Sequence, residues 1–196
     1  GAGRYTADIL PAGCLQAMFL RAPVAHARIT ALDLTAARGM PGIHLVLDAA
    51  ALRAAGMSLG MSGTQVPCRD GSRGAGPERP VLAEGTIRHM GEPLAVVVAD
   101  TAAQAQDAVE AIGLDWDDLP PVTGLGEGPD IHPEAPGNRA YDFALGPEAE
   151  VAAALDASAH RVTVEVVHNR VFPAPMEPRA AFAEWEARRE ARLALI

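Results

Sequence analysis

The most regular pattern of apolar and polar positions in this chain lies between residues 87 and 118. Within it, residues 94–99 form an unbroken, valine-rich apolar run, and this length fits a strand that is buried on both faces. Beyond this run, four apolar residues recur at the spacing of one helical face: Ala105, Ala108, Val109 and Ile112. The pattern therefore predicts a buried strand followed by a helix that packs against it.

Signals at the ends of this strand and helix support the prediction. Thr101 and Gln104 have the spacing of a capping box, which satisfies two amide groups of a first helical turn. Gly113 predicts the end of the helix, because glycine readily adopts the left-handed conformation found there. The sequence Gly91-Glu92-Pro93 predicts a turn into the strand, since a residue before proline avoids the helical region. The stretch contains no candidate nucleophile and no set of metal ligands.

Shorter elements are expected upstream of this unit. The pattern predicts three strands and a helical turn, at residues 15–21, 27–34, 43–47 and 35–40. Asp48 is expected to cap a short alanine-rich helix that ends at Gly56. Residues 57–80 lack periodicity and are rich in glycine and proline, which predicts a long surface loop.

Downstream of the unit, residues 122–138 are again rich in glycine and proline, and this composition predicts a linker. Pro147 is expected at the first position of a helix whose first turn is acidic. Three residues give that helix an apolar face: Val151, Ala154 and Leu155. Residues 161–167 alternate between apolar and polar, so they predict a strand.

The last part of the chain is interrupted by prolines. Three of them within residues 172–178 exclude a central strand there. Short strands are expected at 180–185 and 193–196, with the charged residues 186–190 as the turn between them.

Composition narrows the class of protein. The 196 residues are 49% hydrophobic but only 4% aromatic, so a core must be built from small aliphatic side chains. The net charge of −9 argues against nucleic acid or an anionic membrane as partner. No apolar run approaches the roughly 20 residues that span a bilayer. Cys14 and Cys68 lack the spacing of a metal site or disulfide framework, and a reducing compartment is expected.

Several motifs that could carry chemistry have a simpler structural interpretation. The six histidines show no helical zinc spacing and are interpreted as structural or surface residues. The glycine-rich residues 124–128 do not open a helix, so they make a poor phosphate cradle. An acidic cluster around Trp116 is interpreted as a solvated strand end rather than a calcium loop. In residues 169–179, a structural ion pair between Glu177 and Arg179 is the simpler interpretation of the composition.

Nine short stretches, in this order along nearly the whole chain, carry a resemblance to a known family. They are residues 3–9 (GRYTADI), 19–29 (FLRAPVAHARI), 41–43 (PGI), 80–83 (PVLA), 87–99 (IRHMGEPLAVVVA), 117–122 (DDLPPV), 132–134 (HPE), 169–170 (NR) and 175–179 (PMEPR). By these stretches the chain resembles the molybdopterin-binding large subunit of the xanthine dehydrogenase, aldehyde oxidase and carbon monoxide dehydrogenase family.

The resemblance implies an α+β fold in three parts. Residues 1–120 are expected to form an α/β hammerhead domain, 121–140 a linker, and 141–196 the first strands and helix of an incomplete molybdenum-cofactor-binding domain. Family large subunits are much longer than this chain, so we expect it to be an N-terminal portion.

The resemblance also implies where a site would lie. Five residues are expected near the molybdenum site: Pro173, Met176, Glu177, Pro178 and Arg179. The glutamate that acts as general base in the family is expected beyond the end of the chain. Xanthine-oxidising members carry a glutamine near the position of Val171, which cannot donate a hydrogen bond. The substrate branch is therefore expected to be an aldehyde, carbon monoxide or an N-heterocycle.

Cofactors and partners follow from the same resemblance. The complete enzyme is expected to use molybdenum bound to molybdopterin, in the cytosine dinucleotide form. Iron–sulfur clusters of the 2Fe–2S type and FAD are expected on partner subunits, because two cysteines are too few for either cluster. The expected partners are the remainder of the molybdopterin subunit, these two subunits and a small-molecule substrate. The expected location is the cytoplasm, or the periplasm through a partner's signal.

The chain alone is expected to act as scaffold and subunit contact, without catalysing a reaction itself. Three alternatives stay open. The hammerhead could be a stand-alone binding or assembly module, or the enzyme could be split over several chains. A small-ligand site in residues 57–80 is the third.

Overall fold

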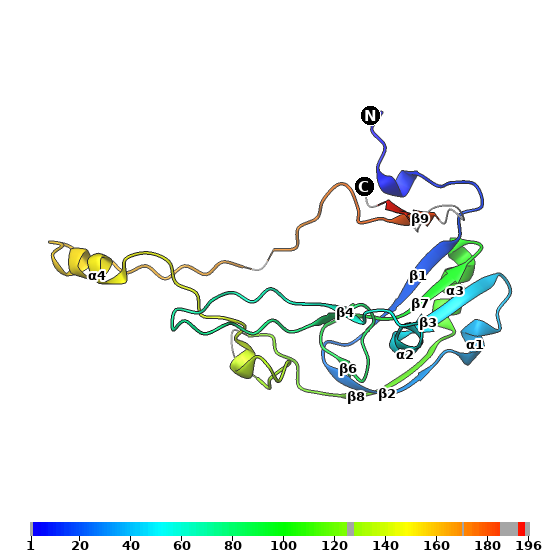
Figure 1. Cartoon of the computed structure of the whole chain (residues 1–196), viewed down its shortest axis with the longest axis horizontal. Coiled ribbons are helices and arrows are strands. Elements are labelled where there is room, and N and C mark those ends of the chain that lie inside the picture. The colour runs from blue at the N-terminus through cyan, green and yellow to red at the C-terminus, as the bar shows by residue number, and fades with distance from the viewer. Residues whose placement is uncertain (1, 125–127, 170, 185–191, 195–196) are drawn as a thin grey trace. The chain divides into compact units, whose positions relative to one another are not determined.

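The computed structural model describes residues 2–124, 128–169, 171–184 and 192–194 (Figure 1). The chain forms two compact units. The larger unit is Leu15–Gly146, and the smaller unit combines Gly1–Cys14 with Pro147–Ile196.

The larger unit is organised around a three-stranded antiparallel sheet in the order β1-β7-β3 (Figure 1). Its strands are β1 (Gln16–Arg21), β7 (Pro93–Ala99) and β3 (Ile43–Asp48), which confirms the three strands predicted from these segments. The valine-rich strand β7 lies in the centre, where Val97 pairs with Met18 on one side and Val46 on the other. A central position explains the unbroken apolar run, because both faces of β7 are covered or half-covered.

Helix α3 (Ala102–Glu110) packs on one face of this sheet, as its periodicity predicted (Figure 1). The Thr101 side chain accepts a hydrogen bond from the Gln104 amide at 3.2 Å, so the cap is present. The Gln104 side chain does not complete the box, because its Oε1 accepts from the Thr101 hydroxyl at 2.8 Å rather than from the Thr101 amide, while its Nε2 donates to the Pro41 carbonyl. The stop predicted at Gly113 is wrong: Ala111 ends the helix in a right-handed conformation, and Gly113 begins the next strand beside Asp33.

A second antiparallel sheet has the order β6-β2-β8. It consists of β6 (Thr86–Ile87), β2 (Ala27–Asp33) and β8 (Gly113–Asp118). The acidic cluster lies on β8 with exposed side chains, which confirms its interpretation as a solvated strand end. There, Trp116 Nε1 donates to Asp118 Oδ1 at 3.0 Å.

Two short helices connect these strands where the sequence predicted them. They are α1 (Thr35–Arg38) and α2 (Ala49–Ala54). Asp48 Oδ1 caps α2 by accepting from the Ala51 amide at 2.8 Å. Gly56, with φ of 72°, follows the helix, and Gly91, with φ of 80°, makes the turn before β7.

Residues 57–80 are more ordered than the predicted loop. Strand β4 (Gly60–Met61) pairs with β5 (Arg79–Pro80), and a further bridge joins Pro67 to Arg73, so the excursion is a long hairpin (Figure 1). Glycine permits the two backbones to approach closely: a Cβ at Gly63 would lie 2.7 Å from backbone atoms of Gly76 and Pro77 on the other side of the hairpin. The glycine content therefore reflects close backbone packing in part, whereas most of residues 57–80 have no regular secondary structure, as the composition predicted.

The segment after β8 also contains local structure. Asn138 adopts a left-handed conformation with φ of 55°, and its side chain bonds the Ile131 amide and the Pro129 carbonyl, each at 2.9 Å. These bonds close a loop over residues 129–138 that ends in η2 (Pro136–Asn138), and they bury Ala135. The predicted domain boundaries stay predictions.

The smaller unit contains η1 (Thr6–Asp8), α4 (Glu148–Asp156) and the antiparallel pair β9 (Phe182–Glu184) and β10 (Arg192–Ala194). Helix α4 is confirmed, although Pro147 caps it rather than occupying its first position. Strands β9 and β10 confirm the described parts of the two final strands. Trp185, the predicted turn at 186–190 and residues 195–196 lie outside the described residues.

The strand predicted at residues 161–167 is wrong for this structure, which has no strand there. Val162, Val164 and Val166 share a face but are 84%, 74% and 66% exposed. A strand is stable only when neighbouring strands satisfy its backbone and a layer covers its apolar face. Among the described residues, none of these partners is present, so the alternating pattern has nothing to pack against.

Candidate functional site

The five residues expected near a molybdenum site lie together on a proline-rich segment of the smaller unit. All five are exposed, and Met176 is 87% exposed. The chain bends at Met176 and Glu177. The structural ion pair considered for Glu177 and Arg179 is not among the ion pairs of the described residues.

Glu177 instead bonds to the N-terminal turn of the same unit. Its Oε1 accepts a hydrogen bond from the Thr6 amide at 3.5 Å. The turn around Thr6 is itself built by local bonds: Asp8 Oδ2 accepts from the Tyr5 amide at 2.8 Å, and Arg4 donates to the Asp8 carbonyl at 3.3 Å. The structure therefore joins two of the stretches that carry the family resemblance.

These residues do not by themselves fit a molybdopterin cofactor. A cofactor of that size needs a cleft that covers most of its surface, whereas residues 171–179 are exposed throughout. Within the described residues, no group of three or more His, Cys, Asp or Glu side chains could hold a metal ion. We therefore derive no reaction step through the cofactor from this chain.

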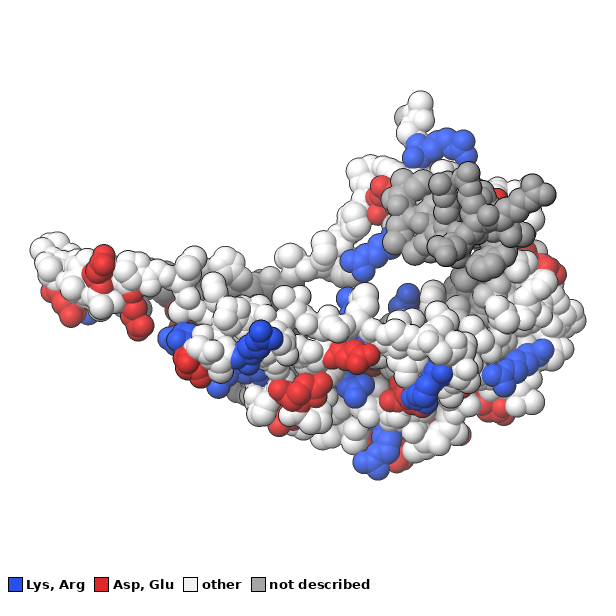
Figure 2. Space-filling model, viewed as in Figure 1, with Lys and Arg blue, Asp and Glu red and all other residues white. Residues whose placement is uncertain are grey.

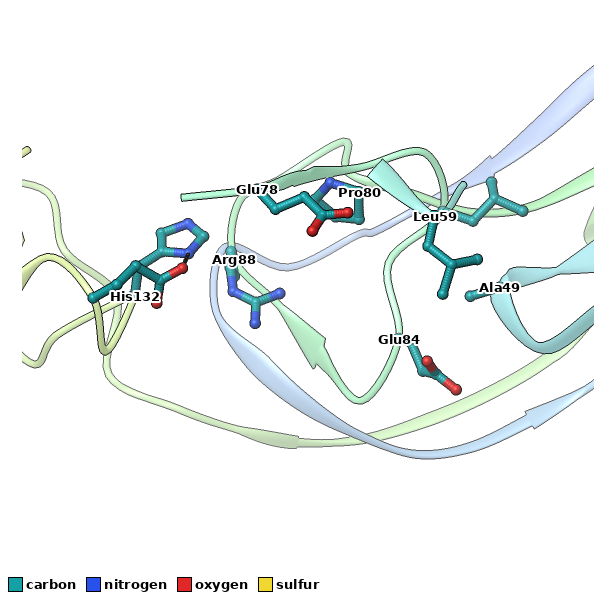
Figure 3. Close-up of a pocket in the computed structure, with 9 residues that line it drawn as sticks. Ala49, Leu59, Glu78, Pro80, Glu84, Arg88 and His132 are labelled. Carbon is teal, nitrogen blue, oxygen red and sulfur yellow. Dashed lines mark ion pairs between the residues drawn. The ribbon is translucent and has the colours of Figure 1, made fainter. Parts of the chain in front are cut away.

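A second candidate site is a pocket of about 220 Å³ in the larger unit (Figure 3). Figure 3 shows Leu59 and Ala49 on one side, and Arg88 and His132 on the opposite side. The complete lining is Ala49, Leu59, Glu78, Pro80, Leu82, Glu84, Arg88, His132 and Glu134. The pocket thus brings together the 57–80 hairpin, the strand region before β7 and the loop over residues 129–138.

Polar groups dominate one wall of this pocket. Glu92 does not line the pocket, but it supports Arg88 from behind the lining: it is only 3% exposed, and its Oε2 accepts from the Arg88 amide at 2.6 Å. The Arg88 Nε is buried and has no hydrogen-bond partner among the described residues. Its Nη1 reaches the Thr86 carbonyl at 3.4 Å, which is a weak contact.

His132 faces the same wall. Burial lowers the pKa of His132 below its ordinary value, and the nearby positive charge of Arg88 lowers the pKa further. Glu134, whose Oε1 is 3.9 Å from the His132 Nδ1, acts in the opposite direction on this pKa, as does Glu92. The imidazole is therefore neutral at neutral pH.

The pocket offers binding groups but no nucleophile. Its carboxylates and Arg88 have opposite preferences for a ligand's charge, His132 is neutral, and Glu84 is already paired with Arg53. From the sequence, His132 was interpreted as structural or surface, and Arg88 and Glu92 were not among the predicted site residues. Arg88 and Glu92 are four residues apart, but His132 comes from a separate segment, so no local spacing indicates that it joins them.

Other histidines are tied into the framework of the larger unit. His26 is buried, with its Nδ1 2.7 Å from the Pro120 carbonyl. His44 pairs with Asp100 at 2.7 Å on the surface. Figure 2 shows acidic and basic side chains interspersed over the visible face rather than gathered in one patch. Among the described helices, none is long and apolar enough to cross a membrane.

Comparison with known proteins identifies the class that this fold defines. Residues 1–120 match the family profile described as aldehyde oxidase and xanthine dehydrogenase, a/b hammerhead domain. The chain belongs to this family, which confirms the resemblance and the α+β fold predicted from the sequence.

Relatives extend the match beyond the hammerhead. The chain is 34% identical to the nicotine 6-hydroxylase large subunit of Paenarthrobacter nicotinovorans over 189 residues, which is 95% of this chain and 22% of that protein. It is 30% identical to the carbon monoxide dehydrogenase large chain of Hydrogenophaga pseudoflava, over 95% of this chain and 24% of that protein. The chain thus spans less than a quarter of the length of these relatives.

Solved structures agree with this assignment. Quinoline 2-oxidoreductase from Pseudomonas putida 86 matches with a TM-score of 0.56 and 39% identity, over 63% of this chain and 15% of that chain. The aldehyde oxidoreductase from Desulfovibrio desulfuricans matches with a TM-score of 0.52 and 26% identity, over 68% of this chain and 15% of that chain. The relatives are large subunits and chains of molybdenum oxidoreductases.

Proposed function

We propose that this chain is the N-terminal portion of a molybdenum hydroxylase large subunit. The complete enzyme would oxidatively hydroxylate an aldehyde, an N-heterocycle or carbon monoxide. One observation carries the proposal: the nicotine-hydroxylating relative matches 95% of this chain, whereas this chain covers 22% of that relative. In the complete protein this portion supplies scaffold and subunit contacts, and it does not catalyse the reaction alone.

The proposed domain division is a hammerhead at residues 1–120, a linker at 121–140, and the start of a molybdopterin-binding domain at 141–196. The exposure of apolar side chains after residue 147 supports the proposal that the domain beginning at residue 141 is incomplete in this chain. Helix α4 has no buried residue, and Val151 and Leu155 on its apolar face are 53% and 50% exposed. Such a face is stable in a complete domain only when another layer covers it.

The proposed cofactor is molybdenum with molybdopterin cytosine dinucleotide, held mainly by sequence outside this chain, as is the general-base glutamate. The segment holding Glu177 and Arg179 is proposed to lie near that cofactor in the complete subunit. Iron–sulfur and FAD subunits are the proposed partners, since several relatives are named as large chains or as a subunit of a complex. The proposed location is cytoplasmic, with a periplasmic location possible for a complex that a partner's signal exports.

An N-heterocycle is the proposed substrate class within this family. Two relatives with high identity to this chain are named for nicotine and quinoline, both of which contain a nitrogen heterocycle. By the resemblance, Val171 lies near the place where xanthine-oxidising members carry a glutamine, and valine there supports a branch other than xanthine.

The test compares two proteins: the 196-residue chain and the protein encoded by the complete reading frame, each co-expressed with its neighbouring genes. We expect molybdenum near one equivalent, and oxidation of nicotine or quinoline, only for the complete protein. Metal content is measured by mass spectrometry and oxidation by reduction of an artificial electron acceptor.

Three results would contradict the proposal. Stoichiometric molybdenum and turnover in the 196-residue chain would show that it is catalytic alone. A complete protein without molybdenum would instead support a stand-alone hammerhead module that binds or assembles other proteins. Molybdenum on a separately encoded protein that co-purifies with the chain would support an enzyme split over several chains.

A further inference from the structure

The contact between Glu177 and Thr6 joins segments that are 171 residues apart in the sequence. Both residues belong to the smaller unit. One side of the contact is the first residue of η1, and the other is the bend in the proline-rich segment. A contact of this span can hold the two segments together only under two conditions. The donor must lack another acceptor, and the segment that carries the acceptor must have little freedom to move away.

Thr6 meets the first condition. It is 7% exposed, and it is the only buried residue within residues 2–14, 147–169 and 171–184. The first amides of a helical turn have no partner within the turn. The Tyr5 amide is satisfied locally by Asp8, whereas the Thr6 amide is satisfied by Glu177. A buried amide that lost this acceptor would be left without a partner, which is unfavourable.

Glu177 meets the second condition. Pro175 and Pro178 flank it closely, and each fixes its own backbone angle, so the segment has little freedom to bend elsewhere. The negative charge of the carboxylate strengthens its bond to the amide, although the bond is long at 3.5 Å. One side-chain bond at Glu177 therefore sets the direction of several residues around it.

We propose that Glu177 is a positioning residue. Its carboxylate oxygen holds the bend against the N-terminal turn and so fixes how Met176 and Arg179 are presented, instead of touching the cofactor itself. The role of this segment near a cofactor rests on the proposed function, whereas the joint between Glu177 and Thr6 does not.

The joint is tested in the 196-residue chain by amide hydrogen exchange at Thr6, measured by nuclear magnetic resonance. In E177A the Thr6 amide is expected to exchange about tenfold faster, because the acceptor is lost. In E177Q the rate stays near that of the natural chain, since the amide oxygen still accepts. The control is E165A, an exposed glutamate of the same unit. Equal Thr6 exchange in E177A and E165A would overturn the proposal.

A reciprocal variant tests the same joint from the other side. T6P removes the donor N–H, and proline is well accepted at a first helical position. Trypsin cleavage after Arg179 is expected to accelerate in T6P and in E177A, with no further gain in the double variant, because both remove one bond. Cleavage after Arg161 is the internal reference and should not change. Additive effects in the double variant would contradict the joint.

The positioning role is tested in the complete subunit by rescue. E177Q is expected to keep the molybdenum content and the kcat of the natural protein, whereas E177A lowers kcat. Equal loss in both variants would show that the negative charge acts directly and would overturn the positioning role. A complete subunit without molybdenum refutes the proposed function only, because Thr6 exchange is measured in the chain without metal.

Discussion

Arg69 and Asp142 make a two-point contact: Nε and Nη2 of Arg69 lie 3.0 and 2.8 Å from the same carboxylate oxygen. Beside the side chains, the Arg69 amide donates to the Asp142 carbonyl at 2.8 Å. Nearby, the Ala75 amide donates to the Ala140 carbonyl at 2.6 Å. The tip of the 57–80 hairpin is thereby fastened to the chain that follows the closed loop.

Removing the ion pair should loosen this attachment without unfolding the larger unit. In D142A the side-chain contact is lost, but both backbone bonds remain. The free energy of unfolding is therefore expected to fall by less than about 1 kcal/mol, as for other exposed ion pairs. Amide exchange at Ala75 should rise, while the urea midpoint changes little. R73A, which removes an arginine from the facing strand, is the control and should leave Ala75 unchanged. Unaltered Ala75 exchange in D142A would show that the backbone bonds alone hold the hairpin.

The core of the larger unit should be sensitive at its central strand. Val97 is fully buried between the sheet and α3, so V97A leaves a small cavity and is expected to lower the free energy of unfolding by about 2 kcal/mol. The matched control is V162A, since Val162 is 84% exposed and should change stability by less than about 0.5 kcal/mol. Urea unfolding followed by circular dichroism measures both. Equal shifts in the two variants would refute the assigned core.

The sequence predicted the framework well where local pattern and tertiary packing agree. The unbroken apolar run at 94–99 indicated a strand, and the apolar face at helical spacing indicated α3. Both predictions were right because the strand and the helix bury these apolar residues against each other. Gly113 was misassigned, because a glycine after a helix has two uses. It can stop the helix, or it can begin a strand that passes close to a neighbour, here Asp33.

The candidate sites were harder to predict, because their partners are distant in sequence. Nothing near Glu177 indicates that its carboxylate reaches Thr6, and nothing near Arg88 indicates His132. The strand predicted from the alternation at 161–167 was wrong for a related reason. A period of two reports which residues would share a buried face, but it carries no information about whether a covering layer is present.

The exposed valines provide a direct test of the proposed incomplete domain. V164D places a charge where Val164 is 74% exposed, so the 196-residue chain should lose less than about 0.5 kcal/mol of stability. In the complete subunit the same change is expected to bury an unpaired charge, and to reduce soluble yield and melting temperature strongly. T163D, which alters the opposite face, is the control. If V164D is tolerated equally in both proteins, the valine face is not covered by the remainder of the subunit.

Protonation of His132 should weaken the larger unit in mild acid. Burial, and then Arg88, lower the pKa of His132 in the folded chain from its ordinary value near 6.5, so the unfolded chain binds the proton more readily. The stabilising contribution is therefore complete above about pH 6.5 and is lost as the pH falls through the lower folded value. In H132Q the free energy of unfolding should fall less steeply between neutral pH and mild acid than in the natural chain, when urea midpoints are compared. H89Q removes an exposed histidine and should keep the natural slope. If H132Q also keeps that slope, another group accounts for the acid sensitivity of the larger unit.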